Sequence, residues 1–198
     1  MANIQMLTDY GPLVLVAVAA CWGMARIIYL SRREQVKVLS FLARKKTAAE
    51  NGLALIAVTL DAYLLARPFF REIDVWVFAQ PSPLPVFGLI LMGLGIGLMI
   101  ISQIDMGRAW RIGVPQTIEA SQTLITSGVY AYSRNPIYVG IMMFLLGTAI
   151  LLPGPLTLGA VIATFILMQK IILHEETFME SAFGDQYQHY CRHVRRWI

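Results

Sequence analysis

Charged side chains are scarce in this chain: Asp, Glu, Lys and Arg make up 14% of its 198 residues, and apolar types make up 57%. Soluble domains carry about 25% charged residues, so the composition excludes an ordinary soluble enzyme and a disordered chain. A membrane span takes about 20 apolar residues. The chain therefore has room for several spans, but not for a separate soluble catalytic domain of about 100 residues.

Cysteine is scarce as well. Cys21 and Cys191 have no CxxC neighbour, which argues against a disulfide framework and a zinc site. His189 and His193 have the i,i+4 spacing of metal ligands, but without HExxH this spacing favours a solvated helix surface, and we expect no metal. No Lys or Arg precedes the first apolar run, so we expect no cleaved signal peptide.

Five apolar runs predict an all-α, polytopic integral membrane protein with about five transmembrane helices. The runs occupy residues 13–30, 51–70, 84–104, 136–152 and 156–173. Only a Pro-Gly-Pro breaker separates the last two, which should form a helical hairpin. The polarity and spacing of 174–194 predict a cytoplasmic C-terminal helix, or two short ones divided at Gly184. We expect residues 1–198 to form a single membrane-embedded domain.

The positive charges predict the orientation of the spans. With the basic segment 31–50 placed inside, 14 of the 16 Lys and Arg residues fall on the cytoplasmic side. The N-terminus should then lie outside and the C-terminus in the cytoplasm, across the inner membrane if the source is bacterial. This asymmetry explains the net charge of +4, so we expect the lipid bilayer as a partner and no nucleic acid.

Two features lie within the apolar runs. Gly93 and Gly97 have GxxxG spacing, which predicts close packing between helices, because no βαβ unit surrounds them to bind a dinucleotide. Asp61 is an ionisable group inside a span. It is either functional or a polar contact to a neighbouring helix, and both interpretations stay open.

The polar segment between the third and fourth runs is rich in groups that position ligands. Pro136 suits the first turn of a helix, which places Arg134 and Asn135 where the helix N-terminus favours an anion. Three tyrosines can stack on a flat ring or cover a sulfonium cation: Tyr130, Tyr132 and Tyr138. The alternative is a juxtamembrane belt of Tyr and Arg.

Two carboxylates follow the last span, at Glu175 and Glu176. Because the hairpin makes the last two spans antiparallel, we expect Arg134 and Asn135 to lie beside Glu175. A carboxylate there can hold a ribose hydroxyl or an ammonium group. Alternatively, it is only a favourable charge at the start of a cytoplasmic helix.

The sequence LITSGVYAYSRNPIYVG, followed by HEETFMESAFGDQYQHY, resembles the isoprenylcysteine carboxyl methyltransferase and phospholipid methyltransferase family. The family pattern is LVTxGxYxxxRHPxYxG and then EExxLxxxFGxxYxxY. The resemblance covers residues 105–195 and implies a membrane methyltransferase that uses S-adenosylmethionine and a lipid or prenylated acceptor. The implied cofactor-binding residues are Gln116, Gln122, Thr123, Leu124, Ile125, Tyr130, Asn135, Pro136, Ile137, Tyr138 and Glu175.

The chain departs from the family pattern at two positions: Asn135 replaces the usual His, and Ile171, next to Lys170, replaces an Arg that helps to hold a prenylcysteine. The candidate catalytic residues are Arg134, which can hold the cofactor carboxylate or an anionic acceptor, and Glu176, a base or orienting group for an amine. We expect carboxyl O-methylation of an isoprenylcysteine-type acceptor. The alternatives are phospholipid N-methylation, a nicotinamide-dependent reductase of related fold, and a non-catalytic membrane protein.

Overall fold

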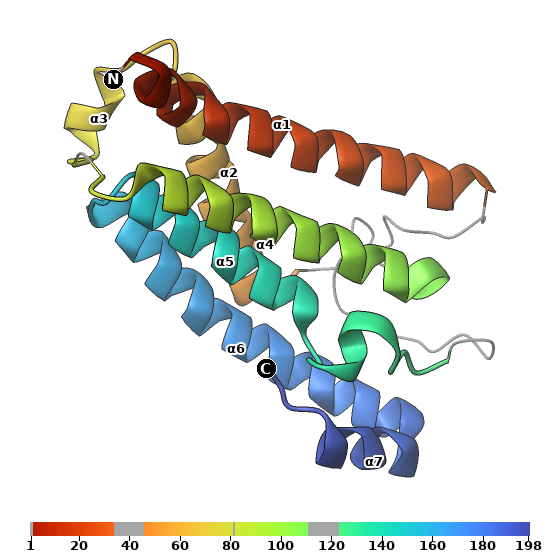
Figure 1. Ribbon diagram of the computed structural model, residues 1–198. Coiled ribbons are helices and arrows are strands. Elements are labelled where there is room, and N and C mark those ends of the chain that lie inside the picture. The colour runs from red at the N-terminus through yellow and green to blue at the C-terminus, as the bar shows by residue number, and fades with distance from the viewer. Residues whose placement is uncertain (1, 34–45, 81, 111–122) are drawn as a thin grey trace.

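The computed structural model describes residues 2–33, 46–80, 82–110 and 123–198, and the described residues contain helices and no strand. Figure 1 shows the long helices side by side. The elements are α1 (Ala2–Arg33), α2 (Ala48–Ala66), α3 (Ile73–Trp76), α4 (Pro85–Met106), η2 (Gly107–Ala109), η3 (Gly128–Ala131), α5 (Pro136–Leu151), α6 (Pro155–Phe183) and α7 (Asp185–His193).

The helices confirm the predicted all-α, polytopic membrane fold. Four described helices are long and apolar enough to cross a membrane: α1, α2, α4 with η2, and α6. The fifth predicted span, α5, is a shorter apolar helix of 16 residues. The C-terminal helix is also present, because α6 continues beyond the predicted span to Phe183 and α7 follows Gly184, whose φ is +48°.

The second helix is shifted toward the N-terminus relative to the predicted 51–70. Thr47 is its N-cap, and a capping box joins the Thr47 and Glu50 side chains to each other's backbone N–H groups. The helix ends at Ala66: Arg67 still has helical dihedrals, but Pro68 has no backbone N–H with which to continue the hydrogen-bond ladder. Both signals are polar or conformational, so the apolar runs of the sequence do not indicate them.

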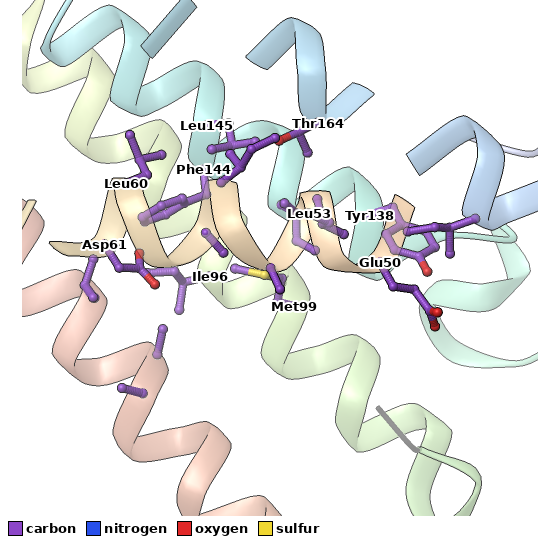
Figure 2. A pocket seen from close by; sticks show the side chains of 18 of the residues that line it. Glu50, Leu53, Leu60, Asp61, Ile96, Met99, Tyr138, Phe144, Leu145 and Thr164 are labelled. Atoms are coloured by element: carbon purple, nitrogen blue, oxygen red, sulfur yellow. The ribbon is translucent and has the colours of Figure 1, made fainter. Parts of the chain in front are cut away.

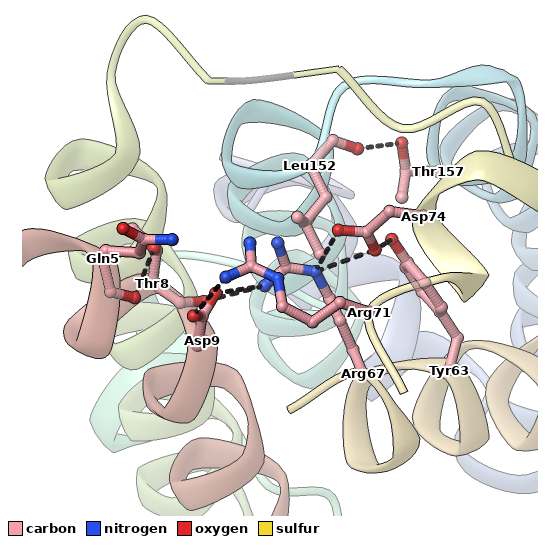
Figure 3. Close-up of polar contacts among 9 residues, drawn as sticks. All are labelled: Gln5, Thr8, Asp9, Tyr63, Arg67, Arg71, Asp74, Leu152 and Thr157. Carbon is pink, nitrogen blue, oxygen red and sulfur yellow. Dashed lines mark hydrogen bonds and ion pairs between the residues drawn. The ribbon is translucent and has the colours of Figure 1, made fainter. Parts of the chain in front are cut away.

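The first helix begins at Ala2 rather than near residue 13, and a polar cluster holds its start in place (Figure 3). Arg67, whose side chain is 8% exposed, pairs with Asp9 at 3.2 Å and with Asp74 at 2.9 Å. The Tyr63 hydroxyl donates to the same Asp74 carboxylate at 2.8 Å, and Arg71 pairs with Asp9 at 2.7 Å. The cluster fastens α1 to the far end of α2 and to α3.

Close packing of α4 against α5 depends on four glycines other than the predicted pair. A Cβ on Gly88 would lie 2.8 Å from the Gly147 carbonyl oxygen, and a Cβ on Gly95 would lie 2.5 Å from that of Gly140. The prediction for Gly93 and Gly97 was wrong: a Cβ there would meet only Leu15 at 3.9 Å, or nothing within 4 Å. The contacting glycines are seven residues apart, which returns them to one face after two turns.

Within the described residues, the ends of α1 and α4 lie close together. Arg26 donates to the backbone oxygens of Gln103 and Gly107 at 2.9 and 3.1 Å, which joins the end of α1 to the end of α4. In Figure 1 these ends and α7 lie on one side of the molecule, and the N-terminus and α3 lie on the other. The described cations of these ends and of α7 therefore lie on a common side of the bundle.

Candidate functional site

The first turn of α5 meets α6 at a depth where both leave the apolar part of the bundle. The Tyr138 hydroxyl donates to Glu175 Oε1 at 2.9 Å, although 37 residues separate them. The prediction that the hairpin brings these two segments together is therefore confirmed. The partners differ from those expected: Glu175 contacts Tyr138, whereas Arg134 contacts the next residue, Glu176.

Glu176 lies between two guanidinium groups. Arg134 Nη2 is 2.9 Å from its Oε1 and Arg196 Nη2 is 2.6 Å from its Oε2. The hydrogen bonds to Glu176 raise the pKa of Arg196 above its ordinary value. Two cations thus share one carboxylate, which leaves a net positive charge, and Arg134 Nε is buried without a hydrogen-bond partner in the described part of the chain. Such a cluster is suited to holding an anion.

The C-terminal segment completes this site through its backbone. The Asn135 side-chain amide donates to the Arg196 carbonyl oxygen at 3.0 Å, and the Arg134 backbone N–H donates to that of Arg195. Asn135 is the N-cap of α5 but makes no capping bond with its side chain. An amide at this position therefore ties the start of α5 to the end of the chain.

Two buried tyrosines join η3 to α7. The Tyr190 hydroxyl donates to the Tyr130 carbonyl oxygen at 2.6 Å. Burial raises the pKa of Tyr190 to about 12 and raises the pKa of Tyr130 above its ordinary value. Both phenols are therefore neutral at physiological pH. Tyr132 lies apart, since its side chain is 79% exposed.

An apolar cavity of about 610 Å³ reaches the Tyr138–Glu175 pair from the interior of the bundle (Figure 2). It is lined by α1, α2, α4, α5 and α6, and Ala54 and Ala57 of α2 line it while remaining exposed. Its polar end carries Lys46, Glu50, Tyr138 and Glu175. Lys46 and Glu50 were not predicted as site residues, because α2 has no recognisable motif and the charges that flank it resemble an ordinary loop.

A profile of the family described as phospholipid methyltransferase matches residues 84–186. The match covers more than half of the chain and contains α4, α5 and α6. The chain belongs to the phospholipid methyltransferase family. The predicted membrane methyltransferase is thereby confirmed, and the match favours it over a nicotinamide-dependent reductase or a non-catalytic protein.

Individual members of the family carry more specific names. The probable protein-S-isoprenylcysteine O-methyltransferase of Oryza sativa subsp. indica is 26% identical over 163 residues, which are 82% of this chain and 80% of the relative. The protein-S-isoprenylcysteine O-methyltransferase of Xenopus laevis is 35% identical over 58% of this chain and 40% of the relative. These names favour carboxyl O-methylation over the other predicted activities.

A solved structure shares the arrangement of helices. The eukaryotic intramembrane Ras methyltransferase, isoprenylcysteine carboxyl methyltransferase, superposes with a TM-score of 0.61 and 26% identity over 86% of this chain. This chain spans 59% of the length of that structure's chain. Both the apolar helices of this chain and the solved structure of a relative thus support a multi-pass membrane architecture.

The structure gives different places to the residues that the family motif implies. Arg134, Tyr138, Glu175 and Glu176 lie together, as described above. Ile137 points elsewhere, since it packs against the Leu30–Trp110 cluster. Pro136 is fully buried.

The remaining predicted residues precede η3. Thr123, Leu124 and Ile125 form a segment without regular structure, and Leu124 lines a separate hollow of about 710 Å³ beside α7. Gln116 and Gln122 lie outside the described residues.

Proposed function

We propose that this family member transfers a methyl group from S-adenosylmethionine to the carboxylate of a prenylated cysteine. The observation that carries this proposal is the apolar cavity that ends at the Tyr138–Glu175 hydrogen bond. A prenyl tail needs an apolar groove within the bundle, and the reacting carboxylate needs a polar end to that groove. The names of the relatives support the same acceptor.

The residues around α5 fit the cofactor. The net positive Arg134–Glu176–Arg196 cluster, with its unpaired Arg134 Nε, is suited to the amino-acid carboxylate. Glu175 uses one oxygen to accept from Tyr138, and its other oxygen is suited to a ribose hydroxyl or an ammonium group. When bound, S-adenosylmethionine supplies a methyl group already activated by a sulfonium.

The acceptor needs orientation more than acid–base chemistry. A carboxylate is ionised at neutral pH, so the transfer requires no base, and alignment of the reactants supplies most of the catalysis. Glu176 then acts by positioning Arg134, because both of its oxygens accept from guanidinium groups. Asn135 holds the start of α5 through the Arg196 carbonyl.

A cation for the acceptor carboxylate comes from the residue that precedes the N-cap of α2 rather than from α6. Ile171, at the position of the family's Arg, is 7% exposed and lines the cavity. Lys170 is exposed and does not line it. Among the described residues that line the cavity, Lys46 is the one with a cationic side chain, and it lies at the polar end. We therefore assign to Lys46 the role of binding the acceptor carboxylate.

The membrane orientation follows the positive charges. Most of the described Lys and Arg residues lie on the side of the molecule that holds the ends of α1 and α4 and all of α7. Segments rich in Lys and Arg stay on the cytoplasmic side of a membrane. The N-terminus then lies outside, and methylation takes place at the cytoplasmic surface.

Phospholipid N-methylation is the second candidate, because Glu50 and Glu175 both line the polar end and two carboxylates are suited to an ammonium group. The experiment that separates the two uses labelled S-adenosylmethionine, purified protein in vesicles, and N-acetyl-S-farnesylcysteine. A methyl ester releases labelled methanol in base, whereas an N-methyl group does not. Label that appears only in base-stable aminophospholipid would replace the first function by the second.

A Lys46→Met variant tests the acceptor assignment. We expect the KM for the prenylcysteine to rise about tenfold, in line with the loss of a charge-assisted contact, with unchanged affinity for S-adenosylhomocysteine. An unchanged KM would remove Lys46 from the site.

A further inference from the structure

One carboxylate in the cavity is not used by the proposed chemistry. Asp61 lines the cavity from within α2, a helix long and apolar enough to span the membrane. Among the described residues, none forms a hydrogen bond or ion pair with Asp61. Carboxylates inside a span are costly and usually have a ligand, water or a partner, so the interpretation of Asp61 as a polar contact between helices has no support.

Asp61 and Glu50 mark the two ends of one face of α2. The face follows the positions Glu50, Ala54, Ala57 and Asp61, which are spaced four, three and four residues apart. All four line the cavity. The two alanines leave room for a ligand between the carboxylates, and eleven residues of helix separate the two positions along the helix axis by about 16 Å.

The space between the two carboxylates has apolar walls. Figure 2 shows Ile96 and Met99 between Asp61 at one end of α2 and Glu50 at the other. Val16 and Ala19 of α1 line the same cavity. A hydrocarbon tail is therefore stabilised along this stretch, but at Asp61 it would strip water from a carboxylate without supplying a hydrogen bond, which is unfavourable.

We propose that Asp61 sets the length of the acceptor's tail and limits it to three isoprene units. This inference rests on the proposed function, since it assumes a tail that begins at the Glu50–Glu175 end. An extended chain advances about 1.2 Å per bond, so the tail of three units, with twelve bonds from sulfur, spans about 14 Å and stops short of Asp61. A tail of four units spans about 19 Å and passes it.

The experiment compares N-acetyl-S-prenylcysteines with two, three and four isoprene units. It measures both kcat/KM for methylation and binding by native mass spectrometry of the purified full-length protein. The wild type should favour three units over four by about tenfold or more, from the cost of an unpaired polar group. Asp61→Leu removes the carboxylate while keeping a bulky side chain, and it should bring four units to within about twofold of three units.

A second variant moves the limit in the opposite direction. Adding Ala57→Asp to Asp61→Leu places a carboxylate about 10 Å from Glu50, so two units should become preferred over three. Val58→Ala, on the 68% exposed face of the same helix, is the control and should keep the wild-type order. Equal use of three and four units by the wild type, or an unchanged ratio in Asp61→Leu, would overturn the inference.

The two readouts separate this inference from the proposed function. Binding with the expected length limit but without methylation would contradict the function and retain Asp61 as the limit. Methylation of all three compounds with equal kcat/KM would retain the function and contradict the limit.

Discussion

Glu175→Gln tests the proposed cofactor pocket through a single atom. In the wild type, Glu175 Oε1 accepts from the Tyr138 hydroxyl at 2.9 Å, and none of the described residues donates to Oε2. The amide keeps the shape of the side chain. When the amide oxygen of the Glu175→Gln side chain keeps the hydrogen bond from the Tyr138 hydroxyl, the amide NH₂ group stands where the wild type has Oε2, the oxygen that is assigned to the cofactor.

The expected loss follows from that exchange. A hydrogen bond to a charged group contributes about 1.5–3 kcal/mol, and every 1.4 kcal/mol is about tenfold in affinity. We therefore expect the affinity for S-adenosylhomocysteine to fall about 10- to 100-fold, because a donor now faces the hydroxyl or ammonium donor of the ligand.

The assay is isothermal calorimetry with S-adenosylhomocysteine in detergent, together with thermal unfolding to show that the variant is folded. Glu72→Gln is the matched control, since Glu72 is exposed and lies at the opposite end of the bundle. Equal affinity in Glu175→Gln and wild type, with both folded, would refute the assignment of Glu175 to the cofactor.

Three further predictions concern stability. Gly95→Ala should lower the free energy of unfolding by about 1–3 kcal/mol through overpacking against Gly140; Gly97→Ala should not, and equal melting temperatures for the two variants would contradict the packing account. Arg67→Ala leaves two carboxylates without their buried partner and should cost about 3–5 kcal/mol, which thermal unfolding in detergent can measure; a loss below about 1 kcal/mol would contradict the structural role of the cluster. The pKa of Tyr190 is raised to about 12, so the stability that this tyrosine contributes is complete below pH about 10 and is lost as the pH rises through 12. The free energy of unfolding should fall with pH in this range in the wild type, and the Tyr190 contribution to that fall should be absent from Tyr190→Phe. Ionisation of Tyr190 near pH 10 in an ultraviolet titration would contradict its burial.

The meeting of α5 and α6 could be predicted from the sequence because a short connection determines it. The Pro-Gly-Pro breaker leaves the two helices no other arrangement than antiparallel, so residues near 134–138 must lie beside 175–176. The exact partners could not be predicted in the same way. Whether Arg134 meets Glu175 or Glu176 depends on the rotation of α6 about its axis, which its neighbours determine.

The part of the site on α2 could not be predicted. Glu50 lies in the first turn of α2 and Lys46 just before it, far in sequence from the motif, and α2 reaches the site by packing against α6 and α1. The glycine contacts illustrate the same limit. A GxxxG pattern identifies small residues on a helix, but the partner helix decides which of them it touches, and α5 presents its own glycines to Gly88 and Gly95.

The Asn135 contact has no sequence signal. Its side chain binds a backbone carbonyl at Arg196, and a backbone acceptor can belong to any residue type. The family motif identifies the position as important but does not indicate that it holds the C-terminal segment.

The most direct test of the account is the structure of the protein with S-adenosylhomocysteine bound, determined in a lipid nanodisc. The account predicts that the sulfur of the ligand lies at the polar end of the cavity, beside Tyr138 and Glu175, with the ligand carboxylate at Arg134. A sulfur located in the separate hollow between Leu124 and His193, with no path to the cavity, would contradict it.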